Sequence, residues 1–182
     1  MQNNFWVQPE TMNKNFPRPR KNLSKDPGGL KWAKRFLSVA KMVSEWSKDP
    51  GMHCGAVIVR PNGTIASTGY NGFPRGCDDD ESLYNNREVK LERVIHAELN
   101  AILHCPERPL GYTMYCWPPG FGPSCQRCAA HIIQSGISRV VWYADSKCTQ
   151  PGSERWKASC SEGLKMFNEA HVEYYGLDVE QE

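Results

Sequence analysis

The chain has 182 residues, a formal net charge of +2 and an ordinary hydrophobic content of 40%, which together fit one globular domain. The near-neutral charge argues against a nucleic-acid partner, no run of about 18 apolar residues predicts a membrane span, and the N-terminus lacks the pattern of a secretory signal. We therefore expect a cytoplasmic protein.

The first 29 residues are predicted to form an irregular, basic N-terminal arm, because prolines and glycines interrupt them throughout. Residues 30–182 are predicted to form a single domain. The arm reads as a surface tail, with the alternative that Phe5 and Trp6 anchor it against a neighbouring subunit.

Periodicity and turn residues predict four helices and five strands within that domain. The helices are expected at 30–48, 96–103, 125–135 and 153–170. The strands are expected at 55–60, 64–70, 111–117, 137–143 and 171–176. The first two strands form a hairpin, and later strands alternate with helices. This order predicts an α/β fold with a five-stranded mixed sheet and helices on both faces.

Two short motifs carry the chemistry, His96-Ala-Glu98 and Cys125-x-x-Cys128. Two cysteines three apart at the start of a helix place both sulfurs on one face, and a helix N-terminus favours the thiolate that binds metal. With His96 they supply three zinc ligands, which leaves a position for water. The close cysteine pair and the absent signal favour metal binding over disulfides for the eight cysteines. The alternative is a closed structural site with Cys105 or Cys116 as the fourth ligand.

Glu98 lies two residues after His96, in the first turn of the same predicted helix. We interpret it as a proton carrier beside the metal and not as a ligand. It would take a proton from the attacking water and return protons to a ring nitrogen and to leaving ammonia.

The chain resembles the zinc-dependent cytidine and deoxycytidylate deaminases over about residues 30–145. H-x-E with P-C-x-x-C is a signature of zinc nucleobase deaminases, and the segments 47–50, 55–59, 69–77 and 96–103 are similar to those of the deoxycytidylate branch. The resemblance implies the three-layer cytidine-deaminase-like fold and hydrolysis of dCMP to dUMP, which feeds dTMP synthesis. It also implies a homohexamer, activation by dCTP and inhibition by dTTP.

The resemblance further implies a nucleotide effector site on the loop after the second strand, with magnesium on the triphosphate. Its residues here would be Gly69, Tyr70, Gly72, Pro74 and Arg75. From the residues alone, Asn71-Gly72 is better interpreted as an ordinary turn. The acidic sequence 78–81 reads as a solvated surface, or else as a cation site.

Three residues are candidates for substrate binding. By analogy with related deaminases, Asn71 would bind the deoxyribose 3′-hydroxyl. Lys48 is the candidate for the phosphate, with an exposed lysine near a helix end as the alternative. Tyr143, or else its neighbour Trp142, is a candidate for stacking on the base, with a place in the core as the alternative.

One departure from the family concerns Ser124, which separates Pro123 from Cys125, and the loop before it is longer than usual. This motivates the hypothesis that the enzyme accepts dCTP or 5-substituted dCMP as well. Two further alternatives remain, a deaminase that edits nucleic acid and a zinc-stabilised module that senses nucleotides without catalysis.

Overall fold

The structure is a computed structural model, and it describes residues 27–117, 122–143 and 154–177. Its centre is one five-stranded sheet in the order β2-β1-β3-β4-β5. The strands are β1 (Gly55–Val59), β2 (Ile65–Tyr70), β3 (Thr113–Trp117), β4 (Arg139–Tyr143) and β5 (Glu173–Leu177). β1 pairs antiparallel with both β2 and β3, whereas the pairs β3–β4 and β4–β5 are parallel. The mixed sheet expected from the sequence is confirmed.

Alternation along the strands divides the core into two clusters, one on each face of the sheet. Ala56 and Ile58 of β1 face one cluster, and Val57 and Val59 face the other. All five residues of β1 are buried, as expected of a central strand with helices on both sides. The expected three layers are therefore present.

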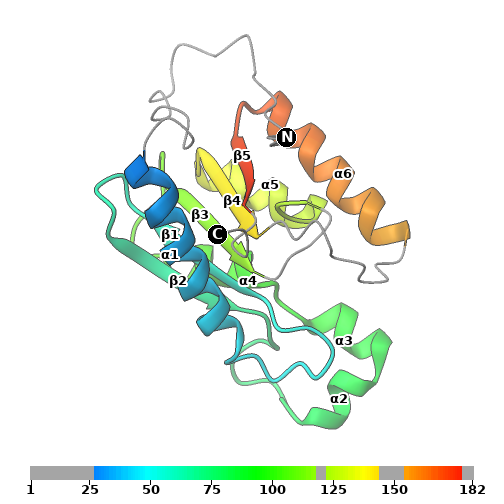
Figure 1. Ribbon diagram of the computed structural model, residues 1–182. Helices are drawn as coiled ribbons and strands as arrows, with labels where there is room; N and C mark the ends of the chain where they lie inside the picture. The colour runs from blue at the N-terminus through cyan, green and yellow to red at the C-terminus, as the bar shows by residue number, and fades with distance from the viewer. Residues whose placement is uncertain (1–26, 118–121, 144–153, 178–182) are drawn as a thin grey trace, which may run out of the picture.

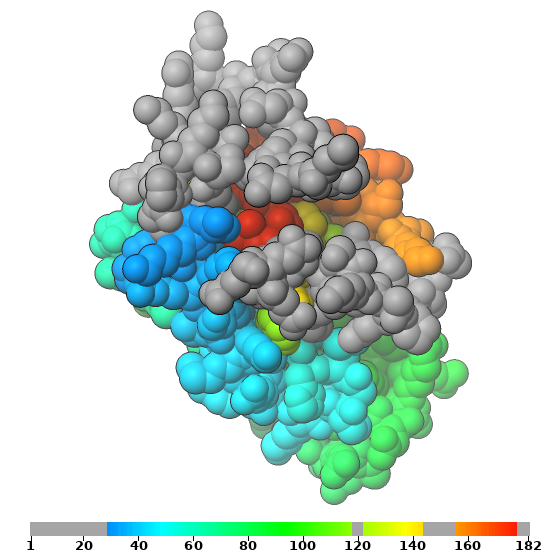
Figure 2. All heavy atoms as spheres, in the orientation of Figure 1, coloured from blue at the N-terminus to red at the C-terminus, as the bar shows by residue number. Residues whose placement is uncertain are grey.

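Among the described helices, α1 (Pro27–Ser44) is the one that covers the other cluster's face of the sheet, with Val57 and Val59. Its apolar stripe recurs at three- and four-residue spacing and packs on β1, β2, β3 and β4, and Tyr175 and Leu177 of β5 border the same cluster. Figure 2 shows α1 in blue over this face, with atoms of β5 in red beside it. The buried residues on this side are Ala33, Phe36, Leu37, Ala40, Val57, Val59, Tyr115 and Val141.

The opposite face carries α4 (Ala97–Leu103), α5 (Gln126–Ser135) and α6 (Glu154–Glu169). Phe167 of α6 is fully buried in this cluster together with Ile132 of α5 and Met114 of β3. Gly136 ends α5 in the left-handed conformation at φ 91°, as its place after the last predicted turn suggests. The same cluster contains Cys125 and Cys128, so the candidate ligands belong to this layer.

Two short helices, α2 (Glu81–Asn85) and α3 (Arg87–Arg93), occupy a segment in which the sequence predicted none. Side-chain caps start both helices: Asp80 accepts from the amide of Ser82, and Asn86 accepts from the amides of Glu88 and Val89. Figure 1 shows both helices away from the sheet. They are too short for hydrophobic periodicity to reveal, and α3 contains no buried residue.

Other boundaries differ from the expectations by a few residues. The first helix begins at Pro27, inside the segment assigned to the arm, and ends at Ser44 instead of Lys48. Residues 45–47 continue as a tighter turn, in which each amide bonds the carbonyl three residues earlier. The rest of the arm lies outside the described residues. Within the described ranges, no helix has both the length and the apolarity to span a membrane, and the seven described cysteines are free thiols.

Candidate metal and catalytic site

The three candidate metal ligands come together at the N-terminal ends of two helices. His96 is the N-cap of α4 and Cys125 is the N-cap of α5, with Cys128 in the first turn of α5. Neither N-cap side chain bonds the backbone of its own helix, although that is the usual role of this position. Instead, Nδ1 of His96 lies 3.5 Å from Sγ of Cys125 and 3.4 Å from Sγ of Cys128.

These separations fit a zinc ion. Zinc–sulfur bonds of about 2.3 Å and zinc–nitrogen bonds of about 2.05 Å at a tetrahedral angle place N and S about 3.6 Å apart. The three ligand atoms lie within 4.8 Å of one another. In the described part of the chain, neither Cys105 nor Cys116 belongs to this or any other such group. The geometry therefore favours the open three-ligand site over the closed structural one.

The protein environment already favours a thiolate at Cys125. A hydrogen bond from the Cys128 thiol, together with one from His96, lowers the pKa of Cys125 to about 4. The hydrogen bond to Cys125 raises the pKa of His96 in turn. The first turn of α5 adds its partial positive charge at the same place. A thiolate is the form that binds zinc, so the donor set suits the metal.

Glu98 follows within the first turn of α4 and lies against the same group. Burial raises the pKa of its carboxyl, while the neighbouring His96 acts in the opposite direction. A carboxyl with a raised pKa, next to an open metal position, is suited to accept a proton near neutral pH and to return it.

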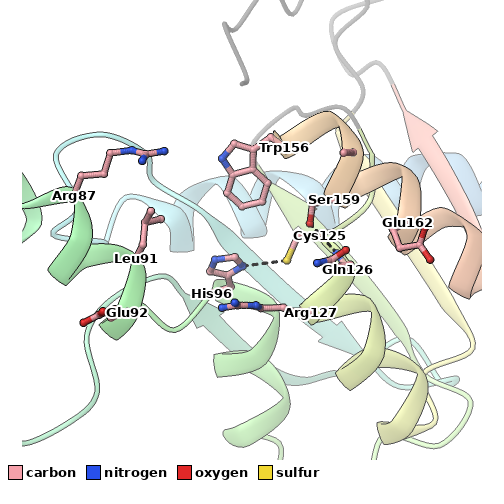
Figure 3. Close-up of a pocket in the computed structure, with 11 residues that line it drawn as sticks. Arg87, Leu91, Glu92, His96, Cys125, Gln126, Arg127, Trp156, Ser159 and Glu162 are labelled. Atoms are coloured by element: carbon pink, nitrogen blue, oxygen red, sulfur yellow. Dashed lines mark hydrogen bonds between the residues drawn. The ribbon is translucent and has the colours of Figure 1, made fainter. Parts of the chain in front are cut away.

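A cleft of about 770 Å³ opens beside His96 and Cys125 (Figure 3). Trp156 of α6 lies above His96, with ring centroids 5.9 Å apart, and the exposed side chain of Arg127 lies below it. Sequence reasoning did not single out either residue. The lining residues are Arg87, Leu91, Glu92, His96, Cys125, Gln126, Arg127, Trp156, Ala158, Ser159 and Glu162.

The helix α6 forms a wall of this site by packing directly on the cysteine turn. The hydroxyl of Ser159 accepts a hydrogen bond of 3.3 Å from the amide of Gln126, an otherwise unpaired donor at the start of α5. Gly163 permits this approach, because a Cβ there would lie 3.0 Å from the carbonyl oxygen of Ser124. Ser124 is buried, and its hydroxyl has no partner among the described residues. A glycine inside a predicted helix was the available sequence signal for this close approach.

The structure places the candidate substrate residues in three different settings. Asn71 is buried and bonded to the turn that follows α1. Lys48 is exposed and forms an ion pair of 2.7 Å with Asp79 of the acidic sequence. Tyr143 is buried and stacks on Trp117 at 4.5 Å. Because Trp117 packs with the cluster under α1, this stacking favours the core alternative for Tyr143.

Gly69 and Tyr70 end β2, and the other candidate effector residues lie in the loop between β2 and α2. Gly69 packs against α4, where a Cβ would overlap the backbone. Tyr70 is partly exposed and meets Trp46 edge-on, and Gly72 pairs with Ile95. Pro74 is partly buried, and Arg75 bonds His104 at 3.0 Å.

Comparison with known proteins matches this geometry to one family. Residues 30–144 match the model of the cytidine and deoxycytidylate deaminase zinc-binding region. The chain is 40% identical over 150 residues to an uncharacterised deaminase encoded in the luxG 3′ region of Aliivibrio fischeri, covering 82% of this chain and 96% of that protein. It is 38% identical over 122 residues to human deoxycytidylate deaminase, covering 64% of this chain and 66% of that protein.

Solved structures show the same fold. The dCMP deaminase of cyanophage S-TIM5 superposes with a TM-score of 0.60 at 22% identity, over 84% of this chain and 99% of that one. The phage enzyme is also known in complex with dCMP and dUMP, with the same TM-score and identity.

Proposed function

This chain belongs to the zinc-dependent cytidine and deoxycytidylate deaminase family, whose members are hydrolases of C–N bonds, and we propose that it deaminates dCMP to dUMP and ammonia. One observation carries the proposal: three ligands for an open zinc site lie at two helix N-termini with the Glu98 carboxyl beside them. A closed structural site has no use for that carboxylate.

The proposed reaction follows from what each residue does. His96, Cys125 and Cys128 would hold the zinc, which would supply an activated water near neutral pH. Glu98 accepts a proton from the water that attacks the carbon bearing the amino group. The same carboxyl then passes protons to the ring nitrogen and to the amino group, which leaves as ammonia while the carbon becomes a carbonyl. Water is the only co-reactant.

Recognition of the nucleotide falls to residues around this centre. In this proposal, Asn71 accepts a hydrogen bond from the deoxyribose 3′-hydroxyl, and Lys48 contacts the phosphate. The ion pair between Lys48 and Asp79 is exposed, so a phosphate can compete for the ammonium at little cost. Arg127, beside His96, is another candidate for the phosphate, because it lines the cleft together with Arg87.

Regulation and assembly complete the proposal. A homohexamer in the cytoplasm, activated by dCTP and inhibited by dTTP, would supply dUMP for dTMP synthesis. The effector residues would be those of the loop from Gly69 to Arg75, with magnesium on the triphosphate. The observation that supports a regulatory role is the pair of backbone bonds between Gly72 and Ile95, which joins this loop to the residue before His96.

The testing experiment measures ammonia release by the zinc-loaded enzyme from dCMP, deoxycytidine and dCTP, each with and without added dTTP. We expect turnover of dCMP and inhibition by dTTP. Turnover of deoxycytidine at the same efficiency would contradict nucleotide specificity, and turnover of dCTP would support the broader substrate range that the longer loop suggests. Unchanged rates with dTTP would contradict the proposed regulation.

A further inference from the structure

Asp49 is a buried carboxylate in the turn that follows α1, and it is only 1% exposed. Its Oδ1 accepts hydrogen bonds from the amides of Gly51 at 2.8 Å and Met52 at 3.3 Å. The same oxygen pairs with Nζ of Lys90 at 2.6 Å. A charge buried this deeply is costly unless it is paired, so Lys90 compensates Asp49 across 41 residues of sequence.

Asn71 contacts the other oxygen of the same carboxylate. Its Nδ2 donates to Oδ2 of Asp49 at 3.3 Å and to the carbonyl of Met52 at 2.9 Å, and its Oδ1 accepts from the amide of Cys54 at 2.7 Å. These partners fix the orientation of the amide, because the carboxylate and the carbonyl need a donor, whereas the amide of Cys54 needs an acceptor. Both amide hydrogens are used, so only a lone pair of Oδ1 remains for another partner.

The backbone beside Asn71 is joined to the candidate metal ligand. Gly72 donates to the carbonyl of Ile95 at 3.1 Å, and Ile95 donates back to Gly72 at 2.9 Å. The next residue is His96. Lys90 lies on α3, just before Ile95, and reaches back to Asp49. Contacts therefore run in a closed ring from Asp49 to Asn71, on to Ile95, and through α3 and Lys90 back to Asp49.

We propose that Lys90 is a positioning residue for substrate binding. By pairing with Asp49, it holds the Asn71 amide at a fixed place relative to His96, with one oxygen lone pair left to accept a hydrogen bond from the sugar hydroxyl. The inference rests on the proposed function, in which Asn71 meets the deoxyribose. Without Lys90, the buried carboxylate loses its cation, and the partner that orients Asn71 is no longer held.

The test compares Lys90→Met with the wild-type enzyme on dCMP and on 2′,3′-dideoxy-CMP, which lacks the 3′-hydroxyl. Loss of one well-placed hydrogen bond predicts a KM for dCMP raised about five- to tenfold, with a smaller change in kcat. The KM for the dideoxy substrate changes by less than about twofold on the same reasoning. Lys90→Arg, which keeps the charge, restores most of the affinity for dCMP.

Lys165→Met is the matched control, because it removes an exposed lysine that pairs with Glu162 at 3.0 Å. We expect it to leave both KM values unchanged. A Lys90→Met variant whose KM rises equally for both substrates, or for neither, would overturn the positioning role. If Lys90→Met does not fold, the two KM values are measured for Lys90→Gln, which removes the charge but keeps a donor for Asp49. A rise in KM for dCMP alone is then the expected result. Absence of dCMP turnover by the wild-type enzyme would instead overturn the proposed function.

Discussion

Gly69 marks a close approach of β2 to α4, and a single methyl group there should destabilise the fold strongly. A Cβ at this position would lie 2.3 Å from the amide nitrogen of Ala101 and 2.4 Å from the carbonyl oxygen of Ala97. Both distances are about 1 Å short of an ordinary contact. The opposing atoms are helix backbone and cannot rotate away. Because overpacking costs about 1–3 kcal/mol even where side chains adjust, we expect Gly69→Ala to cost about 3 kcal/mol.

Thermal unfolding followed by circular dichroism measures this effect. For a chain of this size, a loss of about 3 kcal/mol lowers Tm by about 6–12 °C. Gly72→Ala is the matched control, because the nearest atom to its Cβ would be the Tyr84 hydroxyl at 3.7 Å. That variant should change the free energy of unfolding by less than about 1 kcal/mol. A Tm for Gly69→Ala within about 2 °C of wild type would refute the packing argument and leave Gly69 with only the proposed effector role.

Three further results are expected. Removal of zinc by a chelator abolishes dCMP turnover and added zinc restores it; full activity in metal-free protein would contradict the metal's role. In steady-state kinetics, Lys48→Gln raises the KM for dCMP about threefold or more and leaves the KM for deoxycytidine unchanged. If Arg127→Gln alone has this effect, the phosphate contacts Arg127 instead. Ser124→Ala removes a buried hydroxyl that no described residue pairs with, and it raises the free energy of unfolding in urea by about 1 kcal/mol; a loss of stability would indicate a partner for that hydroxyl.

The parts of the fold that repeat a local pattern could be predicted from the sequence. The apolar sequence of β1 and the glycine after α5 are local signals, and the short spacings within 96–98 and 125–128 place each motif on one helix turn. We could predict that the motifs 96–98 and 125–128 lie side by side, because neither motif alone supplies the three ligands of a zinc site.

What the sequence did not show depends on contacts between distant segments. Lys90 and Asp49 are 41 residues apart, and no periodicity links a lysine on a short helix to a buried carboxylate. Trp156 and Ser159 reach the cysteine turn only because α6 packs across α5. Tyr143 is the last residue of β4, a strand whose side chains alternate between the two clusters. Its stacking on Trp117 is a contact between two strands that the sequence alone does not show.

The central claim is that Glu98 carries protons beside an open zinc site, and one paired measurement tests it most directly. Zinc content and ammonia release from dCMP are determined for the wild-type protein and for Glu98→Gln. We predict one bound zinc and an intact fold for both proteins, with ammonia release from the variant lower by about 10²-fold or more. Wild-type turnover in the variant, or a zinc-loaded wild-type protein that releases no ammonia, would contradict this account.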